Sequence, residues 1–137
     1  AHSKHIAIAL AFLISLTAGL SAKASQVDIE VESYKQSIQN KGTGGLSLEA
    51  SIGLGLTIAH CGPGFAVDVI TYRELTDLET FKAEFKKTSP SEKCTISSIK
   101  LGMALSLLKE RSAKAFETFM AMAKNRLAEE LKSSESK

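Results

Sequence analysis

Apolar residues occupy every second position along much of the chain between residues 27 and 72. The longest alternating run consists of Leu46, Leu48, Ala50, Ile52, Leu54, Leu56 and Ile58. Alternation with a period of two is typical of a half-buried β-strand. A helix would spread these side chains around its circumference and would carry Gly53 and Gly55 in its interior, at a cost of about 1 kcal/mol each. The pattern therefore predicts a strand over residues 46–58.

Two shorter runs alternate in the same way, over residues 27–32 and 65–72. The second run follows the CGPG segment at residues 61–64, so we expect it to pair with the long strand as an antiparallel hairpin with a wide loop. Residues 94–109 carry two patterns at once. Alternation through Leu101, Met103 and Leu105 favours a strand. The spacing of Leu101, Leu105 and Leu108 also fits a helix, so both assignments stay open there.

Helical signals are clear in two segments. Residues 76–79 form a capping box, Lys86 and Lys87 supply positive charge ten residues later, and an apolar stripe lies between them. These signals predict a helix that ends before Ser89-Pro90. A second helix is predicted from the apolar face that runs from Phe116 to Leu131. Residues 132–137 (KSSESK) are expected to be a disordered tail.

Together these elements predict an α+β fold, in which an antiparallel sheet of three to four strands packs against two helices. The alternative is a mostly helical domain with one β-hairpin. No internal repeat or linker divides residues 25–131, which are expected to form a single domain.

The N-terminal segment has the features of a cleavable secretory signal peptide. Lys4 precedes residues 6–20, which are apolar and uncharged, and Ala22-Lys23-Ala24 offers small residues at both positions that a signal peptidase recognises. We therefore expect residues 1–24 to be a signal peptide cleaved after Ala24. The alternatives are a retained single membrane anchor and a buried core helix.

Removal of this segment changes the charge of the chain. The whole sequence has a formal net charge of +2, but taking Lys4 and Lys23 from its 17 basic residues leaves 15, equal to its 15 acidic residues. A nearly neutral domain with interspersed charges lacks the basic surface that nucleic acids attract, so we expect no nucleic-acid partner. Membrane contact is expected only if the segment is retained. Cys61 and Cys94 are the two cysteines, and in an oxidising compartment they are expected to form a disulfide.

The rest of the sequence offers little chemistry. His60 is the only histidine after residue 24, and it continues an apolar row, which favours a structural role. Asp68 interrupts an apolar strand but is expected to face solvent. Asp28, Glu30 and Glu32 have the spacing of an ordinary solvated strand face. No spacing of His, Cys, Asp or Glu indicates a metal site, and no glycine-rich phosphate loop is present, so no metal and no cofactor are expected.

The side of the long strand opposite its apolar row carries small, uncharged residues. Ser51, Gly53, Gly55 and Thr57 are therefore the candidate partner-docking face, since glycines in a strand often mark close approach by a neighbour. The expected function is an exported, non-catalytic interaction protein of the bacterial periplasm or extracellular space, of the inhibitor, immunity, chaperone or assembly-accessory type. Its partner is expected to be a protein, and a homodimer is possible. The alternatives are a single-anchor subunit of a cell-envelope complex and a small carboxylate-using enzyme.

Overall fold

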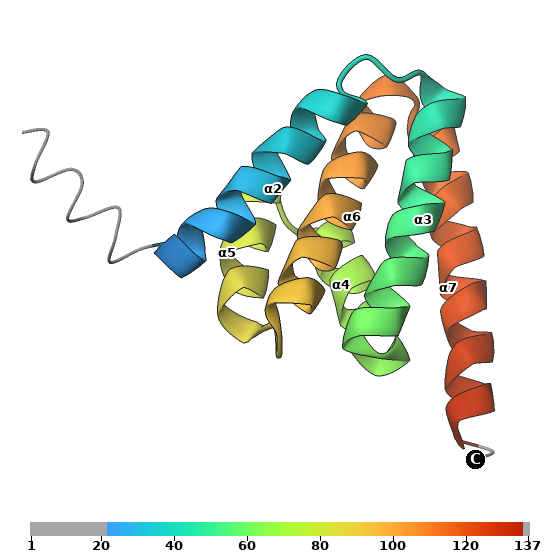
Figure 1. Ribbon diagram of the computed structural model, residues 1–137. Helices are drawn as coiled ribbons and strands as arrows, with labels where there is room; N and C mark the ends of the chain where they lie inside the picture. Colours follow the sequence, from blue (N-terminus) through green and yellow to red (C-terminus); the bar gives the residue numbers. More distant parts are fainter. Residues whose placement is uncertain (1–21, 136–137) are drawn as a thin grey trace, which may run out of the picture.

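The computed structural model describes residues 22–135, which form six helices joined by short turns (Figure 1). They are α2 (Ala22–Ile38), α3 (Thr43–Cys61), α4 (Pro63–Leu75), α5 (Leu78–Thr88), α6 (Glu92–Arg111) and α7 (Ala113–Glu135). The predicted α+β sheet is wrong, because these residues contain no strand. The helical alternative is closer, although its hairpin is also absent from this range. Most of the predicted signal peptide, residues 1–21, lies outside the described residues.

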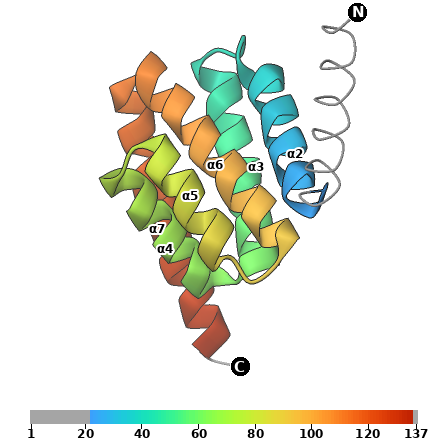
Figure 2. The same cartoon turned by 90° about the vertical axis from the view of Figure 1, so that its left-hand side faces the viewer.

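Helix α6 lies at the centre of the bundle and contacts each of the other five helices (Figures 1 and 2). Figure 1 shows α2 and α5 on one side of it and α3 and α7 on the other. Residues 97–99 and 101–105 of α6 are all buried, and such consecutive runs cover the whole circumference of the helix. A helix covered on all sides needs no polar face. This explains why residues 94–109 carry a pattern that also fits a strand, and why the favoured strand is wrong.

The long alternating run can form α3 because apolar residues at every second position also include residues four positions apart. Every fourth residue of the run also falls on one side of a helix, since i and i+4 are neighbours on a helix surface. Leu46, Ala50 and Leu54 form one such row and are completely buried. Gly53 lies beside this row, where a Cβ atom would be 3.3 Å from the Cα and Cβ atoms of Leu101. The close approach of α6 thus accounts for a glycine inside a helix.

The segment predicted to be a wide hairpin loop is instead a turn between helices. Gly62 has a φ angle of 90°, a backbone conformation that favours glycine, and it ends α3. Pro63 follows as the first residue of α4, where its missing N–H group costs nothing. Helix α4 then buries Ala66, Val69 and Ile70 at helical spacing. The predicted strand over residues 65–72 is therefore wrong, because the buried residues Ala66, Val69 and Ile70 have helical spacing rather than the alternation that suggested a strand.

The two predicted helices are present as α5 and α7. The Asp77 carboxylate caps α5 by accepting hydrogen bonds of 2.8 Å from the Thr80 backbone N–H and 2.9 Å from the Thr80 hydroxyl. These two bonds hold the pKa of Asp77 below its usual value. Ser91 caps α6 in the same way, by accepting from the Cys94 N–H at 3.1 Å. Helix α7 continues to Glu135, so residues 132–135 of the predicted tail belong to its last turn, and residues 136–137 lie outside the described residues.

Candidate functional site: the outward face of helix α3

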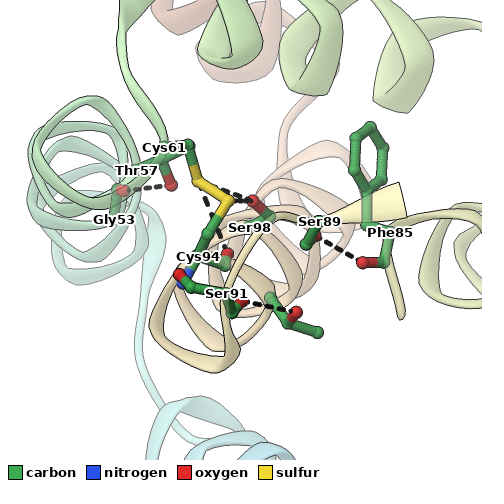
Figure 3. The surroundings of a disulfide bond; sticks show 9 residues. Gly53, Thr57, Cys61, Phe85, Ser89, Ser91, Cys94 and Ser98 are labelled. Atoms are coloured by element: carbon green, nitrogen blue, oxygen red, sulfur yellow. Dashed lines mark hydrogen bonds between the residues drawn. A yellow bond between two sulfur atoms is a disulfide. The ribbon is translucent and has the colours of Figure 1, made fainter. Parts of the chain in front are cut away.

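The disulfide between Cys61 and Cys94 anchors one end of α3. It joins the last residue of α3 to the first turn of α6, with 2.05 Å between the two Sγ atoms (Figure 3). The Ser98 Oγ atom lies 3.5 Å from the Cys61 Sγ atom and 3.9 Å from that of Cys94. Cys94 is completely buried. The bridge closes a loop across 33 positions of sequence, and it holds the C-terminal end of α3 against the N-terminal end of α6.

The four residues of the predicted docking face do not share a surface. Gly53 and Thr57 are buried in the bundle, Gly53 directly against α6, and the Thr57 Oγ1 hydroxyl donates 2.8 Å to the carbonyl oxygen of Gly53 (Figure 3). Ser51 and Gly55 turn toward α7 instead. The reason is geometric: residues two apart share a side of a strand but lie about 200° apart on a helix. Gly53 is thus covered within the domain.

The outward surface of α3 carries a second apolar row, which we call the outer row: Leu48, Ile52 and Leu56. Their exposed fractions are 62%, 49% and 44%. The spacing of four residues places them along one line of the helix, opposite the buried row. Exposed leucine and isoleucine side chains are common singly, but a continuous row on one helix is a feature of interaction surfaces. Sequence reasoning missed this row because it assigned both rows to one strand face.

A groove runs beside the outer row, between α3 and α7. It has a volume of about 440 Å³. Ser47 and Ser51 of α3 form one wall, and Ala115, Phe119 and Met122 of α7 form the floor and the other wall. We call it the α3–α7 groove. Apart from Lys114 its lining consists of small polar and apolar side chains, and the groove places Phe119 and Met122 of α7 next to the outer row.

The charged residues next to this surface are unequally distributed. Lys114 lines the groove at one end, and the guanidinium of Arg126 lies beside Gly55 at the other. No Asp or Glu is among the residues that line the groove. Glu49, the acidic residue of α3, turns toward α2, where it accepts a hydrogen bond of 2.9 Å from the Tyr34 hydroxyl. Burial and this bond raise the pKa of Tyr34.

The same glutamate has a second partner in Lys41, whose Nζ atom lies 3.9 Å from its carboxylate. These two contacts hold the Glu49 carboxylate on the α2 side of α3, away from the α3–α7 groove.

The candidate catalytic and metal-binding residues lie apart from this surface and from one another. His60 and Asp68 are exposed on α3 and α4. Asp28, on α2, forms an ion pair with Lys86 of α5 at 2.6 Å. Glu32 lies one turn further along the same side of α2, whereas Glu30 lies on the opposite side. Within residues 22–135 no three His, Cys, Asp or Glu side chains are placed to hold a metal ion. In that range, too, no helix has both the length and the apolar content needed to cross a membrane.

Comparison of the chain with protein-family models, curated proteins and solved structures finds no match in any of the three. The functional argument therefore rests on the geometry of this fold.

Proposed function

We propose that this chain is an exported, non-catalytic protein of the bacterial periplasm or the extracellular space that acts by binding a protein partner through the outward face of α3. The observation that carries the proposal is the outer row, Leu48, Ile52 and Leu56, whose half-exposed side chains form a row along one helix. The disulfide supports an oxidising compartment, because such bonds persist mainly outside the cytosol. The N-terminal segment supports export, because Lys4, the uncharged apolar residues 6–20 and Ala22-Lys23-Ala24 form the pattern of a signal peptide.

The energetics indicate how extensive the contact must be. Full burial of a leucine or isoleucine side chain contributes about 1.5–3 kcal/mol, so covering the exposed halves of the three residues contributes roughly 2–4 kcal/mol. Association costs at least about 4 kcal/mol in lost rotational and translational freedom. The outer row alone is therefore too small, and a partner must also fill the α3–α7 groove.

Affinity capture from the cell envelope of the host tests this proposal. The tagged chain is expressed with its own N-terminal segment, and three forms are compared: the wild type, Ile52→Glu, and the matched control Ile29→Glu. Ile29 lies on α2 and is 61% exposed, so the control makes the same chemical change on another surface. Both variants are first checked for an unchanged helical circular-dichroism spectrum.

The expected result is an envelope protein that the wild type and Ile29→Glu retain and that Ile52→Glu loses. Retention of the same proteins by all three forms would contradict binding through this face. The intact mass and the thiol content of the recovered chain test export separately. Free thiols in a chain recovered from the cytosol would contradict an exported protein.

A further inference from the structure

The two residues of the disulfide differ in their access to solvent. Cys94 has no exposed surface, because it lies in the first turn of α6 against the end of α3 (Figure 3). Cys61 is partly exposed, since it is the last residue of α3 before a turn. Beyond its immediate chain neighbours, a Cβ atom on Gly62 or Gly64 would have nothing within 4 Å, so the space beside this turn is open. An incoming reagent can therefore reach Cys61 but not Cys94.

The two cysteines also differ in the helix ends that surround them. Cys94 is the third residue of α6, where the helix dipole places partial positive charge. A thiolate is stabilised at such a position. Cys61 lies where α3 ends and α4 begins, so the negative end of one helix and the positive end of the next offset each other. When the bridge opens, Cys94 is therefore the better leaving group.

A buried hydroxyl group accompanies Cys94. Ser98 is completely buried, and its Oγ atom lies 3.9 Å from the Cys94 Sγ atom. Because the two residues are four positions apart on α6, they stay together when Cys61 separates from them. The Ser98 hydroxyl can then donate to a thiolate on Cys94, which favours departure of this sulfur further.

We infer that Cys61 is a thiol-modification site, at which an external thiolate exchanges with the bridge and Cys94 is the sulfur that leaves. The external thiolate attacks the Cys61 Sγ atom and forms a mixed disulfide with it. The bond between the two Sγ atoms breaks, and its electron pair stays on Cys94, so one thiolate is consumed and one is released. The Cys94 thiolate restores the bridge by the reverse attack on Cys61.

The exchange makes the bridge a reversible clamp. The mixed disulfide frees the C-terminal end of α3 from α6, and the return of Cys94 closes it again. This inference goes beyond the proposed function, because it involves neither the outer row nor the α3–α7 groove.

Mapping of the mixed disulfide tests the inference. The chain is expressed with its own N-terminal segment, recovered with the bridge intact and incubated with excess reduced glutathione. Acid stops the exchange by protonating thiolates, and N-ethylmaleimide then labels the free thiols in denaturant. Mass spectrometry of the peptides locates both labels. We expect glutathione on Cys61 and maleimide on Cys94 in about nine of ten adducts, since access and leaving group favour the same direction.

The unfolded chain supplies the control. In guanidinium chloride both cysteines are accessible and α6 is absent, so glutathione should divide about equally between them. Single-cysteine variants give a second measurement, after circular dichroism has shown that each is helical. Cys61 in Cys94→Ala should react with an aromatic disulfide reagent at least about tenfold faster than Cys94 in Cys61→Ala, and the two rates should converge in guanidinium chloride.

Glutathione on Cys94 of the folded chain, or an equal division between the two cysteines there, overturns the inference. So does the absence of any adduct on the folded chain at a glutathione concentration that labels the unfolded chain. A folded protein with one exposed cysteine then replaces glutathione. Attachment of both probes at Cys61 supports a site for small and protein thiols alike, and attachment of glutathione alone supports a site for small thiols.

The proposed function is judged separately. Ile52→Glu should form the same glutathione adduct as the wild type, although it is expected to lose the partner in envelope capture. An adduct at Cys61 together with capture that does not depend on Ile52 would support this inference and contradict the proposed function. The opposite pair of results would do the reverse.

Discussion

The crossing of α5 and α6 brings the ring of Phe81 against the backbone of Gly102. A Cβ atom on residue 102 would lie 2.3 Å from the Phe81 Cε1 atom and 2.9 Å from two further ring atoms, distances that real contacts do not reach. Phe81 is completely buried, and its ring centroid is 4.7 Å from that of Phe85, so the ring has little room to move. Gly102→Ala is therefore the substitution that best tests this packing.

Two opposing effects set the size of the change. Overpacking in a core costs about 1–3 kcal/mol, and a contact of 2.3 Å places this site in the upper part of that range. Replacing a helical glycine by alanine recovers about 1 kcal/mol. We expect Gly102→Ala to lower the free energy of unfolding by about 1–2 kcal/mol.

Gly55→Ala is the matched control on α3. There a Cβ atom would lie 3.6 Å from the nearest atom, the Nη2 of Arg126, which is the flexible end of a side chain. With no overpacking, only the helical gain remains, and the free energy of unfolding should rise by about 0.5–1 kcal/mol. Urea denaturation followed by circular dichroism, with the disulfide intact, measures both variants against the wild type.

The two variants should thus differ in sign. If Gly102→Ala proves as stable as Gly55→Ala, the close packing of Phe81 on α6 is refuted. A third variant, Phe81→Leu, shows whether the loss comes from this contact. Because leucine leaves more room beside residue 102, Phe81→Leu should lower the free energy of unfolding less in the Gly102→Ala background than in the wild type.

Two further predictions concern the bridge and a helix cap. Replacing Cys61 and Cys94 by alanine should lower the free energy of unfolding by roughly 3–4 kcal/mol, because the unfolded chain regains the freedom of a 33-residue loop, and a loss below 1 kcal/mol in urea denaturation would contradict this. The pKa of Asp77 is held down in the folded protein, so its charge stabilises the fold above about pH 4 and this contribution disappears as the pH falls through the lowered value. Asp77→Asn keeps an acceptor without that charge, and the stability of the wild type relative to Asp77→Asn should decrease between pH 5 and pH 2; a difference that stays constant over this range would argue against the cap.

Helices α5 and α7 could be predicted because their signals act within a few residues. The capping box predicted over residues 76–79 would make Thr76 the cap, whereas Asp77 is the residue that caps α5. This cap and the stop at Ser89-Pro90 both depend on local backbone geometry. The apolar stripes of both helices have a spacing of three and four, which a strand cannot use. By contrast, residues 27–32 of α2 and segments of α3, α4 and α6 were wrongly assigned to strands, because apolar residues at every second position occur in helices as well.

Local signals in the sequence thus determined the caps, the breaks at Gly62 and Pro90, and the presence of two cysteines that could be joined. Only the tertiary structure decided which side of α3 faces inward. The row of Leu46, Ala50 and Leu54 and the outer row are nearly equal in apolar character, and hydrophobicity has no direction of its own. Packing against α4, α6 and α7 covers the first row and leaves the second in solvent. The candidate binding face is therefore a consequence of helix packing. The positions of apolar residues along the chain could not show that the outer row is exposed and the other row buried.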